Sequence, residues 1–177
     1  MARRTRRLFR GGRVMDLAAG HGLLAHAMVL LDDSSPLALA IDAAVPASAH
    51  RLHDVLADTW PRLRDRVSVV TSPIDHLSLS REDVVVSSHA CGALTDLVLG
   101  QAMAAHARLA LLPCCHDIET CDTGALGGWL DPALAIDVRR VSRLEAHGYR
   151  VWTQTIPAAI TPKNRLLLAA PLSSAEP

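Results

Sequence analysis

Short apolar runs alternate along the chain with longer segments whose apolar residues recur at helical spacing. The short runs predict strands at residues 13–17, 37–41, 67–70, 83–87, 109–112, 150–156 and 165–170, and the longer segments predict helices at residues 22–31, 46–60, 93–106 and 132–147. This alternation is typical of an α/β fold, in which helices cover both faces of a mostly parallel sheet. No helix fits between the last two strands, so we expect them to pair antiparallel.

Proline and glycine mark the ends of the predicted helices. Pro46 and Pro132 stand in the first turns of two of them, where a missing backbone N–H costs nothing. Gly148 follows the last helix at the position of a left-handed cap. Residues 116–131 contain three glycines and predict a long loop, which a bound ligand would order.

Composition and charge narrow the class of protein. The chain has 177 residues, of which 50% are apolar, enough for one domain with a substantial core. Its formal net charge is zero, but six of its 18 positive charges lie within residues 1–13, so the rest of the chain is net acidic. A broad nucleic-acid surface is therefore disfavoured. We expect the arginine-rich start to be solvated, and the alternative is a short arm that contacts RNA phosphates.

We expect three parts, namely a basic arm at residues 1–12, one domain at residues 13–171 and a tail at residues 172–177. No run of 18 or more apolar residues is present, and the basic start is not followed by the apolar stretch of a signal peptide. These features predict a soluble, cytoplasmic protein without a membrane partner. The four cysteines, two of them adjacent, are poorly placed for disulfides and are expected to stay reduced.

The segment VMDLAAGHGLLA joins the first predicted strand to the first predicted helix. In such sheets ligands bind beyond the carboxyl ends of the strands, where glycines let the backbone approach them. Asp42 lies 20 residues after Gly22 and follows the second predicted strand, where a carboxylate can bind both hydroxyls of a ribose. The pattern therefore predicts a ligand that contains adenosine.

Asp16 distinguishes between two such ligands. Gly20, Gly22 and Ala25 also fit the dinucleotide pattern G-x-G-x-x-A, so a nicotinamide-dependent oxidoreductase is one alternative. The carboxylate of Asp16 would repel a pyrophosphate but attract the positive charges of S-adenosylmethionine, which favours the latter. A second alternative is that Asp16 only caps the helix and the glycines only form a turn.

Histidine and cysteine follow the fourth and fifth predicted strands, in the segments SHACGALTD and LLPCCHD. Because neighbouring parallel strands end at the same edge of a sheet, we expect these side chains to converge there. The converging residues are His89, Cys91, Cys114, Cys115, His116 and Asp117.

Three interpretations of this cluster remain open. We favour a general base at His89 or His116, oriented by Asp117 or Asp96. The second is a zinc or iron site, with the ligands His89, Cys91, Cys114 or Cys115, and His116, although two adjacent cysteines on a regular strand seldom both face one metal. A variant of it is a thiolate set that includes Cys121 and captures arsenic or another soft acceptor. The third is simple packing of the cysteines as small apolar groups.

Several of these motifs resemble one known family. DLAAGHG resembles motif I of the class I S-adenosylmethionine-dependent methyltransferases, with Ala18 where that family usually has glycine. HACGALTD, PCCHD and ITPKNR resemble the branch marked by H-x-C-G-x-x-T-D and C-C-H motifs, which includes eukaryotic enzymes that 2′-O-methylate the tRNA acceptor stem. The likeness extends from Arg13 to Pro171. It implies a Rossmann-like three-layer sandwich with a seven-stranded, mostly parallel sheet and a C-terminal antiparallel strand.

The resemblance also implies an activity, the transfer of a methyl group from S-adenosylmethionine to an oxygen, nitrogen or sulfur acceptor. The zinc-finger segments of the tRNA enzymes are missing from this sequence, and its near-neutral charge favours a small-molecule acceptor, with RNA as the alternative. A non-catalytic metal-binding module on the same fold is a further alternative.

The predicted site has three groups of residues. The cofactor group is Asp16, Ala18, Gly20, Gly22, Asp42 and Asp75, and the resemblance implies that Asp75 contacts the adenine. The catalytic group is His89, Cys91, Cys114, His116 and Asp117. The substrate group is Asp96, Trp129, Lys163 and Asn164, in which Trp129 would stack on a flat substrate and the polar pair would either bind an anion or form a solvated turn.

Overall fold

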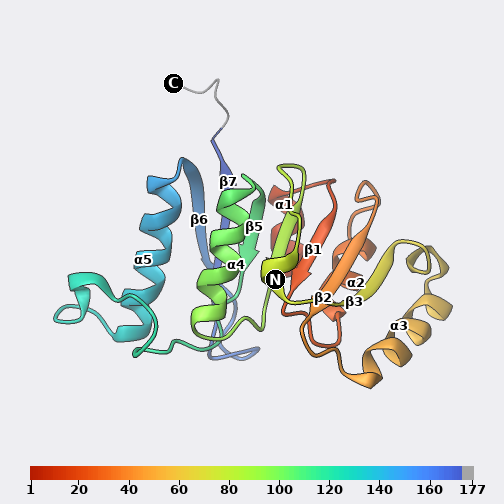
Figure 1. The fold of residues 1–177 in the computed structure, drawn as a ribbon, viewed down its shortest axis with the longest axis horizontal. Coiled ribbons are helices and arrows are strands. Elements are labelled where there is room, and N and C mark those ends of the chain that lie inside the picture. The colour runs from red at the N-terminus through yellow and green to blue at the C-terminus, as the bar shows by residue number, and fades with distance from the viewer. Residues whose placement is uncertain (173–177) are drawn as a thin grey trace.

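The computed structural model describes residues 1–172, which form a seven-stranded sheet with helices on both faces (Figure 1). The strand order is β3-β2-β1-β4-β5-β7-β6. The strands are β1 Val14–Leu17, β2 Ala38–Asp42, β3 Val67–Thr71, β4 Val84–Ser87, β5 Arg108–Leu111, β6 Tyr149–Thr155 and β7 Arg165–Pro171. β1 to β5 pair in parallel, whereas β7 runs antiparallel to both β5 and β6. The predicted fold class and the antiparallel pairing of the last two strands are confirmed.

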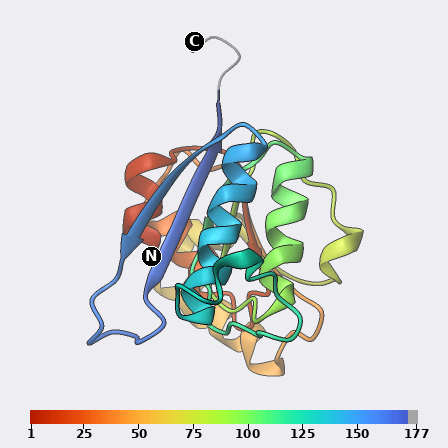
Figure 2. The same cartoon turned by 90° about the vertical axis from the view of Figure 1, so that its left-hand side faces the viewer.

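Helices cover the two faces of this sheet. Within residues 1–172 the α-helices are α1 Ala2–Leu8, α2 Leu23–Leu30, α3 Ala47–Thr59, α4 Ala93–Ala104 and α5 Pro132–Ala146. Figure 2 shows α4 and α5 on one face and α1 on the other. None of these helices is both long and apolar enough to cross a membrane.

The central strand β4 is a run of valines because both of its faces are covered by apolar cores. Val85 packs with Leu99 of α4 and Leu144 of α5, whereas Val84 and Val86 pack in a second core with residues of α1 and α2. Successive side chains of a strand point to opposite faces, so a central strand covered on both sides needs apolar residues at every position.

The arginine-rich start differs from its prediction. Residues 2–8 form α1, which packs against α2, and the side chain of Arg6 is only 3% exposed. Arg6 forms an ion pair with Asp32 at 3.2 Å and donates to Ser35 Oγ at 2.7 Å. The expectation of a solvated terminus is therefore wrong for this helix, although Arg3 and Arg7 remain exposed.

The predicted helix ends are largely confirmed. Asp131 caps α5 by accepting the N–H of Leu134, with Pro132 in the first turn, and Gly148 adopts the expected left-handed conformation at φ +74°. α4 ends two residues earlier than residue 106, because His106 takes a left-handed φ of +51°. Apart from Leu172, the predicted tail at residues 172–177 lies outside the described residues.

Candidate functional site

The carboxyl ends of β1, β2, β4 and β5 lie at one edge of the sheet, because these strands are parallel. β1 pairs with β2 on one side and with β4 on the other, so the chain leaves β1 at the point where the strand order reverses. Ligands of open α/β sheets bind at such switch points. The predicted cofactor and catalytic groups follow these strands, which places most of both groups along this edge.

Asp42, which ends β2, holds the glycine loop that follows β1. Its two carboxylate oxygens accept the N–H groups of Gly20 and Ala44, each at 2.9 Å. Asp42 is half-buried, so part of the residue stays accessible from solvent. The structure thus brings together the acid and the loop that the sequence motif predicted.

Two glycines of this loop leave its backbone uncovered at their own positions. Gly22 has a φ of +75°, and a Cβ atom there would lie 2.7 Å from the Cβ of Ala40, so a side chain is excluded. Gly20 has a φ of +55° and no atom within 4 Å of where its Cβ would be. The space above Gly20 can therefore admit a ligand against the backbone.

Ala18 occupies the position where the resembling family usually has glycine. It retains a left-handed backbone, with a φ of +54°, which costs an L-residue about 1–2 kcal/mol. The loop therefore keeps the conformation of the glycine motif despite the substitution.

Replacing Ala18 with glycine is expected to raise the free energy of unfolding by about 0.5–1 kcal/mol, because the relief of the left-handed strain exceeds the greater freedom of glycine in the unfolded chain. Urea unfolding of the two proteins measures the change. Ala19→Gly is the matched control and should be destabilised, because Ala19 has no positive φ to relieve. Equal losses in both variants would show that position 18 carries no strain.

Asp16 lies beneath the loop rather than on its surface. Asp16 is only 1% exposed, and its Oδ2 accepts the N–H of Ala25 in α2 at 3.0 Å. Burial raises the pKa of Asp16 to about 7, and the nearby charge of Asp42 adds to this shift. The contact is that of a helix cap, the arrangement that the sequence left open as an alternative. The two functions are compatible, since a buried carboxylate also acts on a cation at a distance.

Asp75, the remaining residue of the cofactor group, lies in the 3-10 helix η2 Ile74–His76, after β3. Its side chain is exposed at the same edge of the sheet. Its role towards an adenine stays a prediction.

Three thiols meet where the loops after β4 and β5 touch. The sulfur atoms of Cys91, Cys114 and Cys115 all lie within 4.8 Å of one another, at 3.0 Å for Cys91–Cys114 and 3.7 Å for Cys114–Cys115. The N–H of Gly92 donates to the carbonyl of Cys115 at 3.1 Å and ties the two loops together. The hydrogen bond to Cys114, followed by burial, raises the pKa of the Cys91 thiol to about 12. Both adjacent cysteines can join this cluster because β5 ends at Leu111, before them.

His116 does not join the thiols. Its Nε2 bonds Oδ1 of Asp137 at 2.8 Å, its side chain is 4% exposed, and its Nδ1 is buried without a partner. The carboxylates expected to orient it are engaged elsewhere, because Asp117 accepts from Thr120 and Glu119. The predicted pairing of a histidine with Asp117 or Asp96 is therefore wrong for His116, and Asp137 takes that place.

Asp137 was missed because no local motif marks it. It lies within α5 and reaches His116 only because that helix packs beside the loop after β5. Arg140 and Arg165 also bind this carboxylate, at 3.2 and 2.6 Å. Asp96 of the substrate group belongs to the same ion network, since it binds Arg140 at 2.8 Å.

The predicted metal ligands are corrected by this arrangement. In the part of the chain that the structure describes, the one group that could hold a metal is Cys91, Cys114 and Cys115, without a histidine. His89 is exposed, and His116 is bound to Asp137. Cys121, the expected third thiolate, is buried against Arg140 at 3.7 Å.

Two hollows flank the loop after β5. One, of about 570 Å³, is lined by Cys91, Gly92, Ala93, Leu94, Cys115, His116, Asp117 and Thr120. The other, of about 210 Å³, is lined partly by Lys163, Asn164 and His116. Trp129 is 86% exposed and lines neither of them. The structure thus brings Cys91, Cys115 and Asp117 to the wall of one hollow, and Lys163 and Asn164 to the wall of the other.

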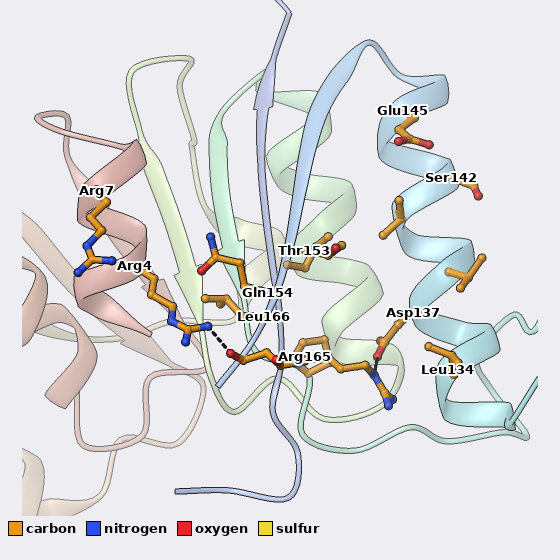
Figure 3. Close-up of a pocket in the computed structure, with 15 residues that line it drawn as sticks. Arg4, Arg7, Leu134, Asp137, Ser142, Glu145, Thr153, Gln154, Arg165 and Leu166 are labelled. Atoms are coloured by element: carbon orange, nitrogen blue, oxygen red, sulfur yellow. Dashed lines mark hydrogen bonds and ion pairs between the residues drawn. The ribbon is translucent and has the colours of Figure 1, made fainter. Parts of the chain in front are cut away.

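A larger groove, of about 990 Å³, lies along the β6–β7 edge (Figure 3). Its walls carry charges of both signs, from Arg4, Arg7 and Arg165 and from Asp137 and Glu145. None of the predicted cofactor residues lines it. The glycine loop and Asp42, rather than this groove, therefore mark the candidate cofactor site.

Comparison with known proteins identifies the family. A family model described as a methyltransferase domain matches residues 4–141. A comparison with curated protein sequences finds no significant match. The fold is similar to that of an O-methyltransferase family protein from Burkholderia thailandensis, with a TM-score of 0.60, 16% identity and coverage of 92% of this chain and 52% of that one.

Two further solved structures share the fold. The pyocyanin biosynthetic protein PhzM has a TM-score of 0.59 and 19% identity, with coverage of 97% of this chain and 54% of that one. TrmK of M. capricolum was solved with its cofactor product S-adenosyl-homocysteine. It has a TM-score of 0.60 and 12% identity, with coverage of 96% of this chain and 66% of that one. The chain thus spans about half the length of the first two proteins.

Proposed function

Because the chain belongs to a family of methyltransferase domains, we propose that it transfers a methyl group from S-adenosylmethionine to an oxygen, nitrogen or sulfur atom of a small acceptor. The observation that carries this proposal is the carboxylate of Asp42, which accepts the N–H of Gly20 beside the open space that this glycine leaves in the loop. The solved structure of TrmK with S-adenosyl-homocysteine supports the choice of cofactor.

The residues at the site fit an adenosyl group. Asp42 offers a half-buried carboxylate that can accept hydrogen bonds from ribose hydroxyls, and Gly20 leaves open space beside it. Ser87, the last residue of β4, has a buried Oγ without a partner at the same edge. When bound, S-adenosylmethionine would supply an electrophilic methyl group on a sulfonium. The chain would act mainly by positioning this group and the acceptor, which accounts for much of the rate in such displacements.

RNA is the second candidate acceptor. The structural neighbours include a 23S rRNA methyltransferase, ErmE, as well as the small-molecule enzyme PhzM. The net charge of zero and the burial of Arg6 favour the small acceptor, because RNA-binding surfaces depend on exposed positive charge.

Calorimetric titration with S-adenosylmethionine, S-adenosylhomocysteine and NADH tests the proposal. The two adenosyl ligands are expected to bind. Asp42→Ala is expected to weaken the affinity for both by roughly 10- to 100-fold, which corresponds to the free energy of a hydrogen bond to a charged group. Asp42→Asn is a second variant that keeps an acceptor for the N–H of Gly20.

Asp65→Ala is the matched control, because Asp65 is exposed and lies before β3, at the opposite end of the strands. Its affinities should equal those of the unmodified protein. Binding of NADH without the adenosyl ligands would overturn the proposal in favour of an oxidoreductase.

A further inference from the structure

We infer that Cys91, Cys114 and Cys115 form a three-thiolate site for one zinc ion, and that the methyl acceptor is a thiol that takes the fourth position on this ion. The inference rests on the proposed function for its methyl donor. It also names the acceptor class of that same site. The separation of the sulfur atoms, the loops that hold them and the hollow beside them carry it.

The sulfur atoms have the spacing that zinc requires. Zinc binds thiolate sulfur at about 2.3 Å, and tetrahedral angles then place the sulfur atoms about 3.8 Å apart. The three thiols already lie within 4.8 Å of one another, and Cys114–Cys115 is at 3.7 Å. The Cys91–Cys114 pair, at 3.0 Å, must open slightly.

The fold holds the three thiols in place from two sides. Cys91 directly precedes Gly92, which has a φ of +56° and is the N-cap residue of α4. Cys114 and Cys115 follow Pro113 in the loop after β5. The hydrogen bond from Gly92 N–H to the Cys115 carbonyl joins these two loops, so the site exists once the sheet has formed. This geometry is better suited to a bound ion than simple packing is, because Cys91 and Cys115 are exposed rather than buried.

An open position is available beside the thiols. Cys91 and Cys115 line the hollow of about 570 Å³, together with Ala93, Leu94 and Thr120. In zinc sites that act on substrates, three protein ligands leave the fourth position free. The mixed apolar and polar lining has room for a small organic thiol.

A thiol acceptor also removes the need for a general base. His116, the next residue after Cys115, is committed to Asp137 through Nε2, and its Nδ1 is buried. A thiol that coordinates zinc is deprotonated outright, and its proton goes to solvent. The acceptor sulfur then attacks the methyl carbon of the sulfonium. The new carbon–sulfur bond forms as the old one breaks, and the electron pair stays on the departing thioether sulfur, with no change in oxidation state.

Metal binding is measured first, on the whole chain stripped of metal. Zinc is titrated against a chromophoric chelator, and cobalt is used as a spectroscopic substitute whose thiolate charge-transfer absorption reports the number of sulfur ligands. One ion per chain is expected, and serine at position 91, 114 or 115 (C91S, C114S, C115S) should weaken zinc binding by roughly 100-fold or more. Cys121→Ser is the matched control and should bind as the unmodified protein does, because Cys121 faces Arg140.

The acceptor is tested on the same cobalt-loaded protein. Ethanethiol should increase the thiolate absorption, whereas ethanol should not. With zinc and S-adenosylmethionine present, S-adenosylhomocysteine should form with small thiols and not with the matching alcohols, and the three serine variants should lose this activity.

The outcomes separate this inference from the proposed function. If S-adenosylmethionine binds but the serine variants keep full methyl transfer or zinc affinity, the zinc inference fails and the proposed function stands. A Cys91–Cys114 disulfide in place of metal also overturns it. If zinc and ethanethiol bind but S-adenosylmethionine does not, the proposed function fails and takes the thiol-methylation step with it.

Discussion

Replacing Arg6 with methionine is expected to lower the free energy of unfolding by about 3 kcal/mol, the lower end of the cost of breaking a buried ion pair. The guanidinium contacts Asp32, whose side chain is fully buried, and also donates to the carbonyl of Met28 at 3.1 Å and to Ser35 Oγ. Methionine fills a similar volume but satisfies none of these acceptors. The loss stays near the lower end because Arg10 and the N–H of Gly11 still bind Asp32.

Arg7→Met is the matched control for this prediction. Arg7 is exposed on the same helix, so its replacement should change the free energy of unfolding by no more than about 0.5 kcal/mol. Urea unfolding of both variants gives the comparison. Equal, small effects would show that α1 does not belong to the cooperatively folded unit. A double variant that adds Asp32→Asn should recover part of the loss, because the carboxylate that has lost its buried partner is then no longer charged.

The same arginine shows where prediction from the sequence fails. The alternation of apolar runs predicted all seven strands and four of the helices, because burial on one or two faces leaves a periodic record along the chain. Burial of an arginine leaves no such record. It depends on Asp32, which is distant in the sequence, and on the packing of α1 against α2.

The candidate site likewise contains residues that could be predicted from the sequence and residues that could not. Asp42 and the glycine loop could be predicted because both follow strands, and strand order fixes where their ends meet. The partner of His116 could not, because Asp137 lies on a helix whose orientation is set by packing. The thiol cluster was predicted only in part. The alternation of side chains along a strand argued against two adjacent cysteines facing one ion, and β5 ends before it reaches them.

The charge of Asp16 has the largest expected effect on stability. In an unfolded chain an aspartate has a pKa near 3.8, whereas burial raises the pKa of Asp16 in the folded protein to about 7. The folded state therefore holds a proton that the unfolded state has released between these two values. The contribution of Asp16 to the free energy of unfolding should fall as the pH rises from about 4 to about 7, and should level off above that range.

Asp16→Asn removes this titration and keeps an oxygen that can accept the N–H of Ala25. At pH 8 the variant should be more stable than the unmodified protein by up to about 4 kcal/mol, since each pKa unit is worth about 1.4 kcal/mol. At pH 4 the two proteins should be nearly equal. Urea unfolding at both pH values measures the difference, with the exposed Asp65→Asn as control. A variant that is equally stable at pH 8, or less stable there, would show that Asp16 is not desolvated as the structure indicates.

The same substitution should weaken the binding of S-adenosylmethionine at pH 8. The ionised carboxylate beneath the glycine loop attracts a cationic ligand, and asparagine leaves only a dipole there. A cationic ligand would in turn lower the pKa of Asp16, so the affinity of the unmodified protein should rise as the pH increases through 7, whereas that of Asp16→Asn should not follow this slope. S-adenosylhomocysteine lacks the sulfonium charge and should show a smaller difference between the two proteins. A gain in stability together with a loss of affinity would mean that this buried charge is retained for the cofactor at the expense of the fold.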